Sequence, residues 1–553
     1  MRRLLFVAGF IACTGSTPDV PDEPEDPLRA LVIESPAPAT WTTQGPVDVS
    51  GTYENLVNLR VGETPATVGD GTFSGATELI RGTNLVRASG ESPGGTLYQA
   101  HVGLIAGPVA DPEQAIADAA QVRLNEPGLD LAMSVAAGLI DEEAIEAILL
   151  ASNPVYSKVD DPELTVDATS FALGGTALDI DALDGSARLT ATLTDLAIGA
   201  DISGRSGRLT VDLSQTLSAT TAVVTGDLGI TVQEGEFRTT LTNVDVVLTG
   251  FAVDTSNWPS WLTGSLTDLL LTEIVEGLIR GFLPDLLPAV IDEQLNSLDL
   301  SFQTTLLERP AQVKARITSA EFDPDGLAIG TELDVDIDGL QPKEAPGYLA
   351  GATGSATADT TSDLSLTLTD DLLNMAAFEA WRAGLLTYTL STQEGTLPPY
   401  VLDALGGARN GVVQISADLP PTIVEEEGQL RAQIAELRIR IDTIDGDNGS
   451  YLILAAGGHI DLDLAVEDGV LKVSFGKKSI ELTVRQTDWT GSLVEVTQVV
   501  EGLLPIEIAL ALLGDLEFPL PTVAGLKVQG ADVQRSSTTL HSRVAVDLEP
   551  TDR

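Results

Sequence analysis

The hydrophobic residues of this chain repeat with two different periods, and the order of the two periods occurs twice. Apolar residues recur at helical spacing over residues 128–150, alternate with polar residues along the segments that follow, and return to helical spacing over 262–298. The second round has helical spacing over 370–386, alternation up to residue 486, and helical spacing over 493–513. Each half therefore predicts long apolar helices packed against one face of a large antiparallel sheet.

The alternating segments locate individual strands. Leu189, Ala191 and Leu193 alternate with threonines, and residues 209–213 and 460–466 repeat the alternation. Strands of this kind have one apolar face and one wet face, which is typical of an antiparallel sheet covered on one side.

Two of the helices have recognisable internal or terminal signals. Pro284 and Pro288 fall inside the run 262–298, so we expect that helix to kink or break there. Thr369 is a favourable N-cap for the helix that opens the second half, and the two aspartates after it would lie beside the positive end of that helix.

The chain carries a large negative charge. Its 82 acidic and 30 basic residues give a formal net charge of −52 at pH 7. Such a field repels nucleic acids and anionic lipid surfaces and favours solubility, so we expect no nucleic-acid partner. Aromatic residues make up only 4% of the chain, so its apolar interior must be mainly aliphatic.

The N-terminal segment has the pattern of an exported, lipid-anchored protein. Two arginines precede an apolar run at 4–12, which is too short to span a bilayer but typical of a signal-peptide core. The single cysteine, Cys13, follows this run and resembles the lipidated first residue of a mature bacterial lipoprotein. We therefore predict a signal peptide at 1–12, a lipid anchor at Cys13, and a disordered, proline- and acid-rich tether at 13–29. The predicted location is the outer membrane or the cell surface; an ordinary secretion signal with an incidental cysteine is the alternative.

Residues 30–107 predict a small all-β sandwich, because short alternating segments lie between turn signals. The succession VDVSG at 47–51, DGTF at 70–73 and GTNLVRA at 82–88 resembles bacterial immunoglobulin-like modules of surface proteins. Such modules usually act as spacers, and a separate spacer is the role that the resemblance implies here.

Groups that could carry reaction chemistry are scarce. The three histidines, His101, His459 and His541, have no ligand-like spacing, and the single cysteine is close to the N-terminus, so we expect neither zinc nor thiol chemistry. Residues 334–339 resemble the beginning of a calcium loop, but the twelfth position of that loop is an alanine. The aspartates also alternate with apolar residues, which favours a strand with an acidic face. We therefore expect no enzyme activity, no cofactor and no metal site.

Three segments together resemble the bactericidal/permeability-increasing protein and lipopolysaccharide-binding protein family, within the tubular lipid-binding superfamily. They are VRLNEPGLDLA at 122–132, LTDDLLNMAAF at 368–378 with its continuation AGLL at 383–386, and FPLP at 518–521. Their order and spacing match the family over residues 115–549.

The resemblance implies an α+β fold of two elongated barrels joined by a central sheet into a boomerang. Each barrel is a strongly twisted antiparallel sheet wrapped around long helices. On this basis the first lipid-binding barrel covers 111–300, the central sheet and linker cover 301–363, and the second lipid-binding barrel covers 364–549.

The function implied by the resemblance is non-catalytic binding, and transfer, of phospholipid or another acyl lipid in apolar barrel pockets at the bacterial cell envelope. The alternative is a surface-anchored interaction or scaffold lipoprotein whose barrels are filled by side chains. The predicted partners are a lipid and, through the lipidated N-terminus, a membrane. The side chains predicted to line the two pockets are Leu129, Met133, Ala136, Leu373, Ala376, Ala377 and Trp381; ordinary core packing is the alternative for each.

Two departures from the family matter. Animal members have a disulfide in the first barrel, which a chain with one cysteine cannot form. Members that bind lipopolysaccharide present basic tips, whereas residues 115–300 contain few bases, and this argues against a role in neutralising lipopolysaccharide. These bases are Arg123, Lys158, Arg188, Arg205, Arg208, Arg238 and Arg280.

Overall fold

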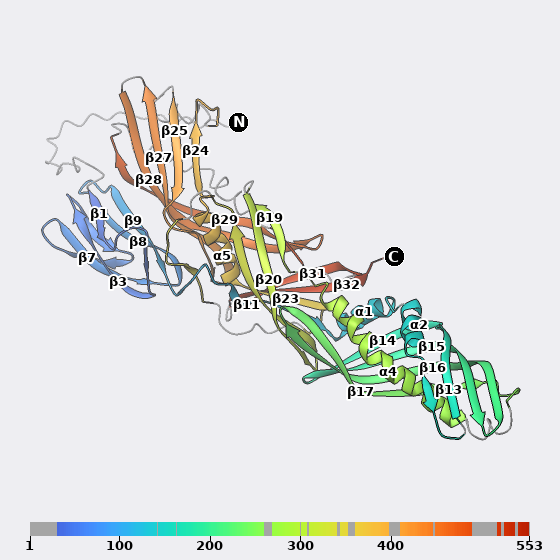
Figure 1. Ribbon diagram of the computed structural model, residues 1–553. Helices are drawn as coiled ribbons and strands as arrows, with labels where there is room; N and C mark the ends of the chain where they lie inside the picture. The colour runs from blue at the N-terminus through green and yellow to red at the C-terminus, as the bar shows by residue number, and fades with distance from the viewer. Residues whose placement is uncertain are drawn as a thin grey trace, which may run out of the picture.

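A computed structural model describes most of the chain (Figure 1). The described residues are 30–140, 142–161, 163–258, 268–298, 300–306, 309–339, 343–351, 360–396, 410–445, 448–488, 517–520, 525–536 and 540–551. Within them the chain is mainly β-strand and contains four helices: α1 (Glu126–Ala137), α2 (Glu142–Ala151), α4 (Asp268–Leu295) and α5 (Asp370–Arg382). Large curled sheets with few helices agree with the predicted α+β fold class. The helix predicted at 493–513 lies outside the described residues.

The N-terminal segment forms two sheets that share a core, as predicted for a sandwich. The sheet orders are β1-β3-β7-β6 and β2-β9-β8-β4-β5. Val49 and Phe73 of the first sheet are buried together with Val86 and Leu104 of the second. The strands are β1 (Leu31–Ser35), β2 (Thr40–Thr42), β3 (Gly45–Tyr53), β4 (Val57–Val61), β5 (Thr64–Pro65), β6 (Thr67–Val68), β7 (Thr72–Leu79), β8 (Gly82–Glu91) and β9 (Leu97–Ala106). That the sandwich is immunoglobulin-like stays a prediction.

The first half of the main body is one strongly curled sheet, here called the first-barrel sheet, which lies along α4 (Figure 1). Its order is β12-β13-β15-β16-β17, with β14 paired to β15 and β18 paired to β16. The strands are β12 (Tyr156–Lys158), β13 (Glu163–Ala172), β14 (Gly175–Leu183), β15 (Ser186–Ser206), β16 (Leu209–Gln233), β17 (Glu236–Thr249) and β18 (Ala252–Val253). The predicted alternation is confirmed at Leu189, Ala191 and Leu193, which are all buried. Leu209 is instead 58% exposed, because it follows the tight turn at Gly207 that ends the β15–β16 hairpin.

A central sheet joins the two halves and draws strands from both of them. Its order is β19-β20-β21-β11-β23-β32-β31, and every neighbouring pair is antiparallel. The strands are β11 (Ile116–Asn125), β19 (Phe302–Leu306), β20 (Arg309–Asp323), β21 (Gly326–Ile337), β23 (Leu364–Thr369), β31 (Leu526–Ser536) and β32 (His541–Pro550). A separate short antiparallel ladder pairs β10 (Val109–Ala110) with β22 (Tyr348–Leu349). In the sequence, β10 precedes β11, and β22 lies between β21 and β23. The central sheet is therefore wider than the segment 301–363 from which it was predicted.

The second half forms a second curled sheet, here called the second-barrel sheet. Its order is β24-β25-β27-β28-β29-β30, with β26 paired to β27. The strands are β24 (Thr387–Ser391), β25 (Gly411–Ala417), β26 (Thr422–Glu426), β27 (Gln429–Asp445), β28 (Asn448–Glu467), β29 (Val470–Thr487) and β30 (Glu517–Pro519). In Figure 1 the first-barrel sheet and the second-barrel sheet lie at opposite ends of an elongated molecule, with the central sheet between them.

The doubled pattern of the sequence corresponds to two strand-to-helix units. β11 runs directly into α1, and β23 runs directly into α5. The two strands pair antiparallel, with Ala120 opposite Leu368 and Leu124 opposite Leu364. The helices therefore leave the central sheet at opposite ends, and each enters its own half of the molecule.

Both helices end earlier than the apolar pattern predicted, and both end near a glycine. The run 128–150 is divided into α1 and α2, because the last turn of α1 tightens at Gly138, whose N–H donates to the carbonyl of Val135 at 3.1 Å. The run 370–386 ends as a helix at Arg382. Gly384 adopts a φ of +79°, and its N–H donates to Trp381 O at 3.0 Å, which closes the helix.

The expected break at Pro284 and Pro288 is absent, because α4 continues through both prolines. A proline in a helix interior costs about 3 kcal/mol. Burial of one large apolar side chain gains about 1.5–3 kcal/mol, and Phe282, Leu283 and Leu287 are all buried around the two prolines. Tertiary packing of this face therefore outweighs the two lost backbone hydrogen bonds.

The N-terminal sandwich is docked against the second-barrel sheet, and it is not a detached spacer. Ile105 of the sandwich shares a small buried apolar cluster with Val424 and Ala435. A Cβ placed on Gly103 would collide with the Cβ of Ala435, and one placed on Gly457 would collide with the side chain of Leu85. Gly103 is therefore required for the close approach of the two surfaces, and a larger residue at Gly457 would force the Leu85 side chain to move. Sequence reasoning did not anticipate this docking.

Polar contacts complete the docking surface. The backbone N–H of Thr83 donates to Gln433 Oε1 at 2.8 Å and to Thr422 Oγ1 at 3.0 Å. The backbone N–H of Gly103 donates to Glu436 Oε1 at 2.7 Å. Undocking would exchange these hydrogen bonds for bonds to water, so each one contributes about 0.5–1.5 kcal/mol net to the docking.

The buried His101 makes this docking sensitive to acid. Its Nδ1 shares a hydrogen bond of 2.6 Å with Thr483 Oγ1. Burial, followed by the nearby Arg485, lowers the pKa of His101 from 6.5 to about 4, while Glu481 opposes this and Arg87 adds to it. A lowered pKa in the folded state means that stability is fully present above pH 6.5 and is lost as the pH falls from 6.5 to about 4.

We expect His101→Gln to remove roughly 3 kcal/mol of this acid sensitivity, since one pKa unit corresponds to about 1.4 kcal/mol. The measurement is the free energy of unfolding of the wild type and of His101→Gln between pH 7 and pH 4. Other buried groups titrate in the same range, among them Glu379, whose pKa burial raises to about 7. They are common to both proteins and cancel in the difference. Parallel pH curves for the two proteins would contradict the assignment.

Candidate functional site

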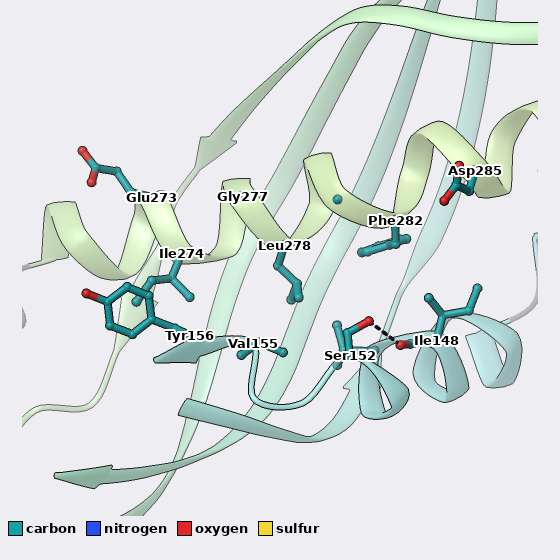
Figure 2. A pocket seen from close by; sticks show the side chains of 12 residues that line it. Ile148, Ser152, Val155, Tyr156, Glu273, Ile274, Gly277, Leu278, Phe282 and Asp285 are labelled. Carbon is teal, nitrogen blue, oxygen red and sulfur yellow. Dashed lines mark hydrogen bonds between the residues drawn. The ribbon is translucent and has the colours of Figure 1, made fainter. Parts of the chain in front are cut away.

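An open cleft lies between α2, β12 and α4 in the first half (Figure 2). Its volume is about 740 Å³, within the range of about 300–1,000 Å³ that is usual for small-molecule sites. Figure 2 shows α4 along one side, with the end of α2 and the start of β12 along the other. The lining residues are Ile148, Leu149, Ser152, Val155, Tyr156, Glu273, Ile274, Gly277, Leu278, Gly281, Phe282 and Asp285.

The cleft exists because one face of α4 lacks side chains in its middle. Glu273, Gly277, Gly281 and Asp285 follow each other at intervals of four residues and so share one helix face. Within the described structure, a Cβ added to Gly277 or Gly281 meets no atom within 4 Å. A glycine in a helix interior costs about 1 kcal/mol relative to alanine, and neither glycine is required here for close packing. Their observed effect is to leave the cleft open.

The walls of the cleft are largely apolar. Ile274, Leu278 and Phe282 also recur at intervals of four on α4, and they face Ile148 and Val155 across the cleft (Figure 2). Ile148 is 39% exposed although it is a large aliphatic residue. The cleft therefore offers an apolar surface that water now contacts, and an apolar ligand would remove that surface from water.

The polar groups of the cleft lie at its margins and are few. The Ser152 hydroxyl donates to the carbonyl of Ile148 at 2.9 Å, so its proton is already engaged within the helix end. Glu273 and Asp285 are exposed on α4. Among the described lining residues none is a lysine, arginine, histidine or cysteine. This set can bind an apolar chain and favour positive charge at the margin, and it contains no nucleophile paired with a general base.

The three side chains predicted to line the first pocket lie elsewhere, in the main buried core. Leu129, Met133 and Ala136 are all on α1 and are at most 1% exposed. None of them is among the residues that line the cleft. The structure brings the three together on one buried helix face, and their role as lipid contacts stays a prediction.

The four side chains predicted to line the second pocket are buried on α5. Leu373, Ala376, Ala377 and Trp381 are each less than 10% exposed. Leu373 borders an enclosed apolar cavity between α5 and the second-barrel sheet, but its volume is only about 10 Å³, close to the minimum for one water molecule. The described part of this cavity therefore has no space for an acyl chain, and the prediction for these residues stays untested.

Trp381 has a clear structural role. Its Nε1–H donates to the carbonyl of Ala417 at 2.8 Å, and its ring contacts Phe378 at a centroid distance of 5.7 Å. The ammonium of Lys343 lies 4.8 Å from the centre of the same ring, within the usual range for a cation–π contact. These contacts fix the C-terminal part of α5 against the second-barrel sheet.

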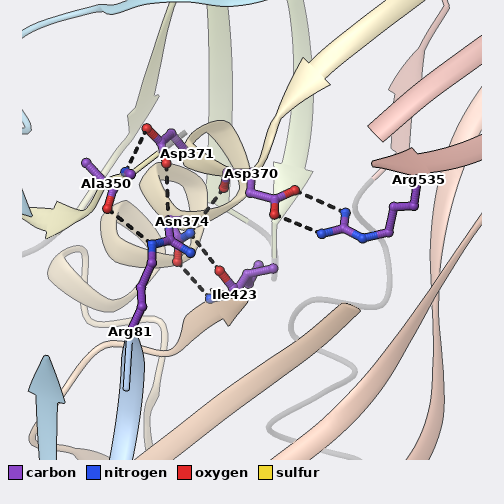
Figure 3. Close-up of polar contacts among 8 residues, drawn as sticks. Arg81, Ala350, Asp370, Asp371, Asn374, Ile423 and Arg535 are labelled. Carbon is purple, nitrogen blue, oxygen red and sulfur yellow. Dashed lines mark hydrogen bonds and ion pairs between the residues drawn. The ribbon is translucent and has the colours of Figure 1, made fainter. Parts of the chain in front are cut away.

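The N-terminus of α5 is held by charged side chains from distant segments (Figure 3). Asp370 is 1% exposed at its side chain and accepts two hydrogen bonds from Arg535 of β31, at 2.8 and 3.0 Å. Asp371 pairs with Arg81 of the sandwich at 3.5 Å. Thr369 occupies the predicted N-cap position, but its side chain makes no capping hydrogen bond. The two aspartates therefore act through specific partners as well as through the helix dipole.

Asn374, one turn further along α5, ties the helix to β26. Its side-chain amide donates to the carbonyl of Ile423 at 2.8 Å, and its Oδ1 accepts from the N–H of Ile423 at 2.7 Å (Figure 3). With the bond from Arg81 to the carbonyl of Ala350 at 3.3 Å, this network links the sandwich, α5 and the second-barrel sheet.

The histidines and most of the aspartates that sequence analysis considered as possible metal ligands or catalytic groups lie on strands of the fold. His101 is in the docking surface of the sandwich, and His541 and His459 lie on β32 and β28. Residues 334–337 form part of β21, with Val335 buried and Asp336 exposed, in agreement with the strand interpretation. No group of three or more histidines, cysteines, aspartates or glutamates among the described residues could hold a metal ion. Among the described helices, none is long and apolar enough to cross a membrane. Cys13 lies outside the described residues.

Comparisons with known proteins give only a distant likeness. No family model matches the sequence, and no curated protein matches it. The crystal structure of lipopolysaccharide binding protein superposes with 13% identity and a TM-score of 0.45, covering 79% of this chain and 100% of that chain. P47 from Clostridium botulinum A2 superposes with 9% identity and a TM-score of 0.30, covering 79% of this chain and 99% of that one. P47 of Clostridium botulinum E1 gives 9% identity and a TM-score of 0.25, covering 79% and 100%. Such scores carry no argument about function, which must be made from the residues of this chain.

Proposed function

We propose that this protein is a non-catalytic carrier that binds one acyl lipid in the cleft between α2 and α4. The observation that carries the proposal is the open apolar cleft of about 740 Å³, kept free by Gly277 and Gly281. Glu273 and Asp285 are twelve residues apart on α4, so the cleft margin extends over about 18 Å at 1.5 Å per residue. That length is comparable to an extended long acyl chain.

The energetics of an apolar cleft suit a carrier. Moving a methylene group from water into an apolar site gains about 0.8 kcal/mol. A lipid taken from a bilayer gains much less, because its chain is already dry there. Exchange between a membrane and the cleft is then close to balanced, which permits both uptake and release. A binding role needs no reacting group, and the lining residues supply none.

The N-terminal pattern supports a location at the cell envelope. We propose that the chain is exported and anchored at the outer membrane or cell surface through a lipid on Cys13. We expect cells fed a palmitate analogue with an alkyne tag to label the wild-type protein and not Cys13→Ser. The readout is fluorescence of the purified protein after coupling to a dye. Equal labelling of the two proteins would contradict the anchor.

One observation favours a second function for the other half of the molecule. The cavity beside Leu373 has a volume of only about 10 Å³, and the sandwich is docked on the second-barrel sheet through buried polar contacts. As far as its described residues show, the second half therefore has the properties of a filled scaffold. In this alternative it supports the sandwich or a protein partner and binds no lipid.

Titration with a fluorescent acyl lipid tests the proposal. A neutral monoacylglycerol with a pyrene group is added below its micelle-forming concentration, and its fluorescence is followed. The expected result is saturable binding to a single site, competed by unlabelled monopalmitoylglycerol and not by glycerol. Absence of saturable binding by correctly folded protein would contradict the proposed function.

A further inference from the structure

The two helices that border the cleft are almost entirely acidic in their charged residues. α2 carries Glu142, Glu143 and Glu146 and no base. α4 carries six further acids and a single base, Arg280. Arg280 is itself paired with Asp245 of β17 at 3.8 Å. The electrostatic potential at the cleft is therefore negative, and it repels an anionic group that approaches the margin.

One end of the cleft is lined by two groups that can each recognise an ammonium ion. Glu273 of α4 and Tyr156 of β12 both line the end of the cleft where Ile274 lies; in Figure 2 Tyr156 is beside Ile274, and the Glu273 side chain extends from the other side of α4. A carboxylate attracts a cation by charge, and the face of a tyrosine ring attracts it through the ring quadrupole. The nearest base along β12, Lys158, is exposed and is not among the lining residues.

Resting on the proposed function, we propose that the bound lipid carries an ammonium headgroup, held at the Glu273–Tyr156 end of the cleft with the acyl chain along Ile274, Leu278 and Phe282. Anionic lipids are then poor ligands, because their headgroups would meet carboxylates at both margins. A neutral lipid of the same chain length should have an intermediate affinity.

The test uses three ligands with the same acyl chain and different charge: palmitoylcholine, monopalmitoylglycerol and palmitate. Each competes with the pyrene-labelled monoacylglycerol on the full-length protein at pH 8 and low salt. We expect palmitoylcholine to bind roughly tenfold more tightly than palmitate, and the ratio to shrink in 0.5 M salt as the charges are screened. Glu273→Gln should weaken palmitoylcholine by roughly threefold, as is usual for loss of one exposed ion pair, and leave monopalmitoylglycerol unchanged.

Lys158→Gln is the matched control, since it removes a neighbouring charge of the opposite sign and should not lower the preference for palmitoylcholine. The outcomes separate the two proposals. Equal affinity for the three ligands, or a preference for palmitate, would overturn the ammonium headgroup and leave acyl-lipid binding intact. Failure of all three to displace the probe, or no saturable binding of the probe itself, would instead contradict the proposed function.

Discussion

Filling the cleft from α4 is expected to weaken the binding of acyl lipids strongly without weakening the fold. In the variant Gly277→Leu/Gly281→Leu, two aliphatic side chains enter the space between α4 and α2. Within the described structure a Cβ at either position meets no atom within 4 Å, so the new side chains occupy the cleft without displacing the backbone. We expect the affinity for the pyrene-labelled lipid to fall by roughly a hundredfold, because the lost apolar contact is worth several methylene groups at about 0.8 kcal/mol each.

The stability of this variant should rise, which separates it from a simple folding defect. Replacing each helix-interior glycine by a good helix former gains about 0.8–1 kcal/mol. The matched control is Gly277→Ala/Gly281→Ala, which makes the same gain in helix propensity and fills little of the cleft. It should be more stable than the wild type and still bind the lipid. Undiminished binding by the leucine variant would mean that the lipid lies elsewhere.

Removing the Asp370 carboxylate should destabilise the second half more than any exposed ion pair does. Asp370 is 1% exposed at its side chain and Arg535 is 16% exposed. Asp370→Ala leaves the guanidinium of Arg535 with its hydrogen bond to Ser542 Oγ, at 2.9 Å, and without a carboxylate to balance its charge. Breaking a buried pair from one side costs about 3–5 kcal/mol, because the other charge stays buried without compensation. The measurement is the free energy of unfolding from denaturant titration.

Two further variants serve as controls for the stability loss of Asp370→Ala. Glu236→Ala breaks the exposed pair with Arg238, whose side chains are 60% and 51% exposed, and should cost at most about 1 kcal/mol. Asp370→Leu/Arg535→Met removes both charges and should recover much of the loss, since a buried pair is often replaceable by apolar residues. A loss for Asp370→Ala no larger than that for Glu236→Ala would show that the pair does not hold α5 in place.

The outline of the fold could be predicted from the periodicity of the sequence. The change from period two to helical spacing after residue 125 and again after residue 369 corresponds to β11–α1 and β23–α5. Helix ends were less predictable, because Gly138 and Gly384 interrupt runs that stay apolar beyond them. Of the kink or break expected at Pro284 and Pro288, the break does not occur, because local backbone preference is outweighed by burial.

The cleft could not be found from the pattern of apolar residues. Leu129 and Met133 belong to a regular apolar stripe and are each only 1% exposed, which is what a core requires. Periodicity cannot distinguish a helix face that meets another element from one that meets an empty cleft. The one available signal was the pair Gly277 and Gly281, four residues apart within a helical run, and its meaning depends on the position of α2.

The docking of the sandwich was also beyond prediction. Gly103 and Glu436, which share a hydrogen bond, are 333 residues apart in the sequence. The local spacing of hydrophobic residues contains no information about a contact between residues so far apart in the sequence. A histidine at 101 and several glycines in predicted strands were visible in the sequence, but each has an ordinary explanation within a strand.

The central claim is that the protein carries an acyl lipid in the cleft of its first half. The most direct measurement is mass spectrometry of organic extracts from protein purified from the cells that naturally make it. The account predicts an acyl lipid at one molecule per chain in the wild type, and its loss from Gly277→Leu/Gly281→Leu prepared in the same way. A wild-type protein free of lipid, or equal lipid in both proteins, would contradict the account.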